Sequence, residues 1–149
     1  LLWPSTKLLL MAATPAILAR KQLAKLERFN EHRRQIAKAY GARLQNTQFE
    51  FLEPREDAAP IFLRVPVRHE KAHEIIRKAW KKNLLLGDWY TTPIAPHDTD
   101  IGKMGYEWGS CPMAEKLAAT TLNLPTHIRI TEKEIKRIVQ FLKPETYRE

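Results

Sequence analysis

The sequence predicts an α+β domain in which a long N-terminal connector helix leads into a small, mostly antiparallel sheet packed by helices. Three observations support this fold class. Apolar residues recur at helical spacing through the first third of the chain, short β-rich runs bounded by proline and glycine follow, and two further helices close the chain. The 149 residues, of which 44% are hydrophobic, suffice for a domain with its own core.

The first predicted element is a helix that begins at Thr14-Pro15, because proline is tolerated in a first helical turn. Its apolar residues at near-helical spacing are Leu23, Leu26, Phe29, Ile36, Tyr40 and Leu44. About 30 residues would span roughly 45 Å at 1.5 Å per residue. This length is typical of a connector between domains, so we assign residues 1–45 to a connector segment and residues 46–149 to a small domain.

Two strands and a second helix are predicted next. Residues 48–52 alternate enough for a strand, and residues 53–60 form a polar loop rich in breakers. Residues 61–67 are the strongest strand pattern, and Pro66 places its end at a sheet edge or exit. Residues 70–82 predict an amphipathic helix with four inward residues, Ala72, Ile75, Ile76 and Ala79.

The middle of the chain ends in a long loop. Residues 84–86 are three leucines that predict a buried strand, which Gly87 ends. Residues 88–109 predict an irregular loop, and a loop of this length is uncommon unless it has a function.

The last two predicted helices begin at Pro112 and Thr131. Proline suits the first turn, and the predicted inward face of that helix is Ala114, Leu117, Ala118 and Leu122. An extended segment, 122–127, follows. Thr131 with Glu134 then forms a capping box, and the apolar stripe behind it is Ile135, Ile138, Val139 and Leu142.

Several short motifs occur in a fixed order along the chain. They are Lys21 to Tyr40, Cys111-Pro112, Ala114-Glu115, Leu122-Asn123-Leu124-Pro125-Thr126-His127 and Thr131-Glu132. Their spelling and order resemble the C-terminal part of the DegT/DnrJ/EryC1/StrS sugar aminotransferases, a family of fold-type-I enzymes that use pyridoxal phosphate. The resemblance covers residues from about 12 to 143 and implies the small-domain architecture of that family.

The resemblance also implies a function. The parent enzyme would move an amino group from an amino acid, usually glutamate, to a nucleotide-linked keto sugar. In the family the cofactor lysine lies in a large N-terminal domain within a serine-x-x-lysine segment, and no such segment occurs here. We therefore predict that the chain holds no catalytic and no cofactor-binding residue and is inactive alone. The implied partners are the large domain, a homodimer partner and the nucleotide sugar.

The loop after Gly87 is the predicted substrate contact. In the family the equivalent loop carries a Tyr-Pro-x-Pro-x-His pattern, which Tyr90, Pro93, Pro96 and His97 echo with an extra residue or two. The resemblance thus implies substrate binding by Tyr90 and His97. Aromatic and histidine side chains on a loop also suit a sugar–nucleotide ligand. In the alternative interpretation, Trp89 and Tyr90 fill the rim of the core and His97 is solvated.

Three further features favour structural roles. His69-Glu70-Lys71-Ala72-His73 matches the H-E-x-x-H pattern of zinc proteases, but Lys71 would place a cation beside the metal and no third ligand follows, so we predict no metal site. Cys111 at a helix start could be a reactive thiol, although a buried structural role is expected. For His127 we expect local hydrogen bonding.

The charge of the chain leaves one alternative function open. The formal net charge is +8, and many basic residues lie on the two predicted helices, which could indicate a standalone module that binds nucleic acid or a protein partner. A solvated helix face explains the same pattern. No run of 18 apolar residues predicts a membrane span, and the single cysteine fits a reducing, cytoplasmic location. The apolar residues Leu8 to Ala13 are expected to pack on another surface.

Overall fold

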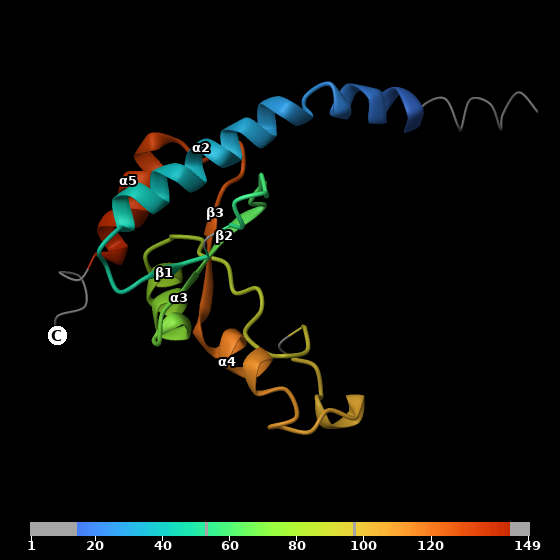
Figure 1. The fold of residues 1–149 in the computed structure, drawn as a ribbon, viewed down its shortest axis with the longest axis vertical. Helices are drawn as coiled ribbons and strands as arrows, with labels where there is room; N and C mark the ends of the chain where they lie inside the picture. Colours follow the sequence, from blue (N-terminus) through green and yellow to red (C-terminus); the bar gives the residue numbers. More distant parts are fainter. Residues whose placement is uncertain (1–14, 53, 97, 144–149) are drawn as a thin grey trace, which may run out of the picture.

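The computed structural model describes residues 15–52, 54–96 and 98–143, and it has the predicted α+β architecture (Figure 1). Helical residues 15–23 precede the named elements. These are α2 (Leu26–Leu44), β1 (Glu50–Phe51), β2 (Arg64–Arg68), α3 (Ala72–Lys81), the 3-10 turn η1 (Gly102–Met104), α4 (Pro112–Thr120), β3 (Thr121–Pro125) and α5 (Glu132–Leu142).

The sheet has three strands in the order β1-β2-β3, and both pairings are antiparallel. Its third strand is β3 and not the predicted strand at residues 84–86. The burial of these leucines alternates: Leu84 and Leu86 are buried, whereas Leu85 is 77% exposed. However, the segment beside β3 makes a single bridge, between Gly87 and Asn123. The prediction of a buried strand ended by Gly87 is therefore wrong, because one bridge is too short to form a ladder.

Pro66 lies in the central strand, yet it breaks no ladder hydrogen bond. It stands opposite Asn123, whose backbone N–H and C=O both bond to Gly87 on the far side of β3. Pro66 and Asn123 are thus a non-hydrogen-bonded pair, and the Pro66 nitrogen points away from β3. On that side β1 pairs only with Val67 and Arg68. The strand is therefore locally an edge at Pro66. It does not end there, however, because β2 runs from Arg64 to Arg68 and not over the predicted residues 61–67.

The long N-terminal helix is interrupted, whereas the sequence predicted one continuous helix. Residues 15–23 are helical, Ala24 and Lys25 form a turn, and α2 begins at Leu26. At the turn the Lys25 N–H donates to Gln22 O, three residues back, instead of four. All residues from 15 to 28 are exposed, so packing does not enforce one regular helix there. In Figure 1 this segment projects away from the sheet.

The second half of α2 packs firmly. Ile36, Tyr40 and Leu44 recur every four residues and are buried. The Tyr40 hydroxyl donates to Pro125 O at 3.2 Å, which joins the helix to the end of β3. Arg43 donates to the Glu132 carboxylate at 2.5 Å, and α2 lies beside α5 (Figure 1). Among the described residues of the connector, contact with the domain therefore begins near Asn30 and is firmest from Ile36 to Leu44, whereas residues 15–28 are exposed.

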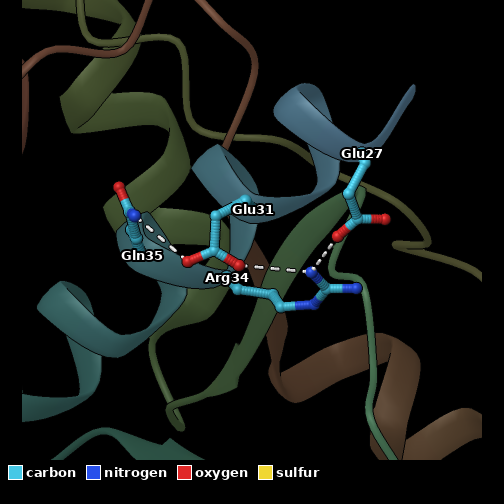
Figure 2. Close-up of polar contacts among 4 residues, drawn as sticks. All are labelled: Glu27, Glu31, Arg34 and Gln35. Atoms are coloured by element: carbon cyan, nitrogen blue, oxygen red, sulfur yellow. Dashed lines mark hydrogen bonds and ion pairs between the residues drawn. The ribbon is translucent and has the colours of Figure 1, made fainter. Parts of the chain in front are cut away.

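Exposed charges reinforce α2 around its first turns. The Arg34 guanidinium donates to Glu27 at 2.8 Å and to Glu31 at 3.2 Å, and Gln35 donates to the second oxygen of Glu31 (Figure 2). The hydrogen bonds with the two carboxylates raise the pKa of Arg34. Such solvent-exposed pairs contribute little to stability, because water screens the attraction between the charges. They thus orient side chains on the helix surface more than they hold the fold.

The remaining helices test the predicted faces. The inward residues of α3 are those predicted, α5 buries Phe141 in addition to the four predicted residues, and the Thr131–Glu134 capping box is present. The face of α4 is different, because Ala118 is its one buried residue and Leu117 remains 39% exposed. Leu122 belongs to β3. The prediction for α4 is wrong because this helix lies at the end of the sheet away from α2 and α5 (Figure 1), and its contact with α3 buries only Ala118.

Candidate functional site

The loop that begins at Gly87 encloses a small hollow. Gly87 and Asn123 exchange two backbone hydrogen bonds, of 2.8 and 3.0 Å, so the loop leaves the outer side of β3 at a fixed point. A hollow of about 300 Å³ follows, lined by Asp88, Trp89, Tyr90, Thr91, Thr92, Ala95 and Pro96. Its size is at the lower end of small-molecule sites.

Two aromatic rings form the open wall of this hollow. The rings of Trp89 and Tyr90 are nearly parallel, with centroids 6.4 Å apart and planes inclined by 14°. The Arg64 guanidinium lies over the Trp89 ring, 4.8 Å from its centroid. Trp89 is 50% and Tyr90 60% exposed, so the rings do not fill the rim of the core. An exposed ring face can stack against a base or the C–H face of a sugar.

Polar groups near the rings can add hydrogen bonds. Asp88 and Thr91 line the hollow and are half-buried. Thr92 is already used, because its hydroxyl donates to Ile94 O at 2.7 Å. His97 lies outside the described residues, so its predicted role beside Tyr90 stays a prediction. The arrangement therefore offers a flat aromatic surface with a carboxylate and a hydroxyl beside it, which suits a polar ring-shaped ligand.

The two histidines of the H-E-x-x-H motif serve other partners. His69 precedes α3, and its Nδ1 accepts a hydrogen bond from the Lys71 N–H at 2.9 Å, while its Nε2 lies 3.1 Å from Gln48 Oε1. His73 Nε2 lies 3.0 Å from Ala118 O. Burial lowers the pKa of His69. Within the described part of the chain, no three His, Cys, Asp or Glu side chains are placed to hold a metal ion.

The other two residues discussed from the sequence have different outcomes. Cys111 is exposed, so the expectation of a buried structural role is wrong. Cys111 directly precedes α4, a helix in which Ala118 is the one buried residue. His127 does take part in local hydrogen bonding, because its Nδ1 accepts from the Arg129 N–H at 3.3 Å and its carbonyl lies 3.2 Å from His32 Nε2.

A larger hollow was not predicted from the sequence. It has a volume of about 650 Å³ and lies between α2 and the segment that carries β1 and the start of β2. One wall has small residues of α2, Ala37, Gly41 and Ala42, and the other has Phe49, Phe51 and Phe62. The sequence feature that could have predicted this hollow is the set of small residues at helical spacing in α2, together with the phenylalanine-rich segment that follows it. The surface is mainly apolar and shows no convergent set of reactive groups.

Among the residues that the structure describes, no helix is both long and apolar enough to cross a membrane.

Comparisons with known proteins agree on one family. A model of the DegT/DnrJ/EryC1/StrS aminotransferase family matches residues 8–143. No curated protein sequence matches the chain.

Solved structures with the same fold include several sugar aminotransferases. DesV from S. venezuelae, in complex with a ketimine intermediate, is 21% identical with a TM-score of 0.75; the match covers 89% of this chain and 36% of DesV. Spr1654 from Streptococcus pneumoniae, a putative sugar aminotransferase in its PMP-form, is 20% identical with a TM-score of 0.73, over 82% of this chain and 32% of that one. NtdA from Bacillus subtilis, with bound PMP, is 24% identical with a TM-score of 0.59, over 76% of this chain and 27% of NtdA. The chain thus spans about a third of the length of these proteins.

Proposed function

The chain belongs to the DegT/DnrJ/EryC1/StrS aminotransferase family, and on this basis we propose that it is the C-terminal part of a pyridoxal-phosphate-dependent sugar aminotransferase. The parent reaction would transfer an amino group from an amino acid, with glutamate the expected donor, to a nucleotide-linked keto sugar. The observation that carries the proposal is the family match over residues 8–143, together with the coverage of only 36% of DesV. The division into a connector, residues 1–45, and a small domain, residues 46–149, is part of the same proposal.

The cofactor would be held mainly by residues outside this chain. Pyridoxal phosphate needs a lysine for its aldehyde, an acid for the pyridine nitrogen and donors for the phosphate. No lysine or arginine lines the hollow at Tyr90. A separate polar basin contains Lys116 and Arg68, but Arg68 is paired with Glu50, and Glu70 adds negative charge where a phosphate would need donors. Neither of these two hollows therefore offers the set of groups that the cofactor needs.

The part of the reaction assigned to this chain is substrate contact. Tyr90 would place its exposed ring against the substrate, and Asp88 or Thr91 would accept or donate hydrogen bonds to its hydroxyl groups. His97 is proposed for the same loop by its place in the family pattern. The large domain and a homodimer partner would complete the site.

Two titrations of the purified chain test this assignment. With pyridoxal phosphate, we expect no stoichiometric absorption band of a lysine adduct in the visible spectrum; such a band, lost on changing one specific lysine, would overturn the cofactor assignment. With UDP-glucose as the probe, we expect weak NMR shift changes that centre on Tyr90. They should disappear in Tyr90→Ala and persist in Trp108→Ala, which removes an equally exposed ring elsewhere. Shift changes confined to another surface would count against the Tyr90 loop.

The nucleic-acid alternative gains little from the charge distribution. Arg34 and Arg43 of α2 are held by carboxylates, as is Lys78 of α3. Arg20, Lys21 and Lys25 are exposed on the projecting segment, where no aromatic residue lies between them. Retention of the chain on DNA at physiological ionic strength, lost as salt rises, would support the alternative.

A further inference from the structure

Asn123 is a buried polar side chain of β3, on the sheet face opposite to its core neighbours Leu122 and Leu124. It lies in β3 between Leu122 and Leu124, which are fully buried, and is itself only 6% exposed. A buried amide is costly unless it is hydrogen-bonded. Its Nδ2 donates to the backbone carbonyl of Trp89, 34 positions earlier in the chain. The hydrogen bond of this amide therefore leads out of the sheet, to the loop that lines the hollow.

The backbone of Asn123 holds the same loop. Its carbonyl accepts from the Gly87 N–H at 2.8 Å, and its N–H donates to Gly87 O at 3.0 Å. With the side-chain bond to Trp89, one residue makes three hydrogen bonds to a segment of three residues. The beginning of the loop is thereby fixed to the most buried strand of the sheet.

Arg64 of β2 contacts the loop from a second direction. Its guanidinium covers the Trp89 ring at 4.8 Å from the centroid. Its Nη1 lies only 2.5 Å from the place that a Cβ on Gly87 would occupy, and the Asn123 Cβ lies 3.1 Å from it. A side chain at position 87 would therefore displace the Arg64 guanidinium and press against the Asn123 Cβ. Glycine therefore leaves the space in which the guanidinium lies against the Trp89 ring.

We propose that Asn123 and Arg64 are positioning residues for the Tyr90 loop. Asn123 fixes the backbone at Trp89, and Arg64 covers the Trp89 ring. Together they set the place from which Tyr90 presents its exposed face. Binding groups on loops need such support from residues on rigid elements. The functional role of this positioning rests on the proposed substrate contact of Tyr90. The positioning itself can be measured without any ligand.

The test is loop order in the whole chain, measured by NMR. The heteronuclear NOE is recorded for the Trp89 indole N–H and the Tyr90 backbone N–H. In the unchanged chain both should have values close to those of the core. Asn123→Asp keeps the size of the side chain but replaces the donor by an acceptor that faces the Trp89 carbonyl. We expect both NOE values to fall to those of a mobile loop while the helix content is kept.

A matched control separates positioning from general loss of stability. Thr126 directly follows β3 and is buried as well, and its hydroxyl bonds to Phe62 O and Leu63 O, neither of which belongs to the loop. Thr126→Val should lower the melting temperature and leave both NOE values unchanged. A folded Asn123→Asp with native NOE values, or an equal fall in Thr126→Val, would overturn the proposal. If Asn123→Asp does not fold, Arg64→Leu tests the proposal instead: in that variant the NOE of the Trp89 indole N–H should fall, and an unchanged value would overturn the proposal. Failure of UDP-glucose to bind would count against the proposed function and leave these measurements standing.

Discussion

The effect on stability of replacing a glycine depends on its surroundings, as Gly87 and Gly41 show. A Cβ at Gly87 would meet Arg64 and Asn123, whereas a Cβ at Gly41 would meet nothing within 4 Å. Because the Arg64 guanidinium can move aside, Gly87→Ala should lower the free energy of unfolding by about 1 kcal/mol, at the low end of the cost of overpacking. Gly41→Ala, within α2, should raise it by about 0.5–1 kcal/mol through helix propensity. Urea denaturation measures both, and equal effects of the two changes would contradict the structure.

Tyr40 gives a prediction that depends on pH. Burial raises the pKa of Tyr40, and the nearby charge of Glu134 adds to the effect. Because the folded state holds the phenol proton more tightly, stability is complete below the unfolded pKa of about 10 and is lost as the pH rises above it. Tyr40→Phe should lower the free energy of unfolding by about 1 kcal/mol at pH 8, because it removes the hydrogen bond to Pro125 O. Between pH 8 and 11 the free energy of unfolding of this variant should fall by less than that of the unchanged chain. Parallel loss in both proteins, measured by urea denaturation at the two pH values, would show that Tyr40 is not the titrating group.

Asn123 marks the limit of prediction from sequence at this scale. The sequence places it in an extended segment, but the partners of its amide and backbone lie at Trp89 and Gly87. No periodicity connects these positions. Tyr90 could be singled out because an aromatic residue on a long loop is visible in the sequence, whereas the group that holds the loop emerges only from the pairing of strands.

Among the elements, the turn before α4 has its own anchor. Glu115 Oε1 accepts from the Tyr106 hydroxyl at 2.6 Å and from the Gly109 N–H at 2.7 Å. The bond from Tyr106, followed by that from Gly109, lowers the pKa of the Glu115 carboxyl below its ordinary 4.5. The stabilisation is thus complete above the unfolded pKa and is lost as the pH falls through the lower, folded value.

We therefore expect the turn to loosen on acidification before the core unfolds. Trp108, which packs edge-on against Tyr106, reports it by fluorescence. In Tyr106→Phe the pKa of Glu115 should rise toward 4.5, so a direct titration of that carboxyl by NMR gives a higher midpoint than in the unchanged chain. An unchanged midpoint would mean that the Tyr106 bond does not set the pKa.

The helices were predictable from sequence in proportion to their burial. In α3 and α5 the apolar residues at helical spacing face the core, so pattern and structure agree. In α4 the same kind of pattern faces mostly solvent, because its contact with α3 buries only Ala118. The interruption at Ala24 and Lys25 carries no proline or glycine signal, so local sequence could not place it. The three leucines at 84–86 were misassigned because a short apolar run alone does not show whether a partner strand is present.

At the scale of the whole molecule, the projecting helical segment is the most exposed apolar feature near the N-terminus. Ile17, Leu18 and Leu23 each expose more than half of their surface. Leu8 to Ala13, expected to pack on another surface, lies outside the described residues. We predict that the isolated chain self-associates through this segment, because large exposed apolar patches favour association.

Light scattering and circular dichroism test that prediction. The double change Ile17→Gln and Leu18→Gln should make the chain more monomeric and leave its helix content intact. Leu85→Gln, at a similarly exposed leucine on another part of the fold, is the control and should change nothing. A chain that is already monomeric at high concentration would contradict the prediction.

The central claim is that this chain is the C-terminal part of a larger aminotransferase whose cofactor lysine lies elsewhere. The most direct measurement is peptide mapping by mass spectrometry of the natural polypeptide, purified from its source and reduced with borohydride to fix any pyridoxal adduct. The account predicts a polypeptide that extends beyond Leu1 and carries one pyridoxyl-lysine in a peptide N-terminal to it. A pyridoxyl-lysine within residues 1–149, or a natural polypeptide confined to these residues, would contradict it.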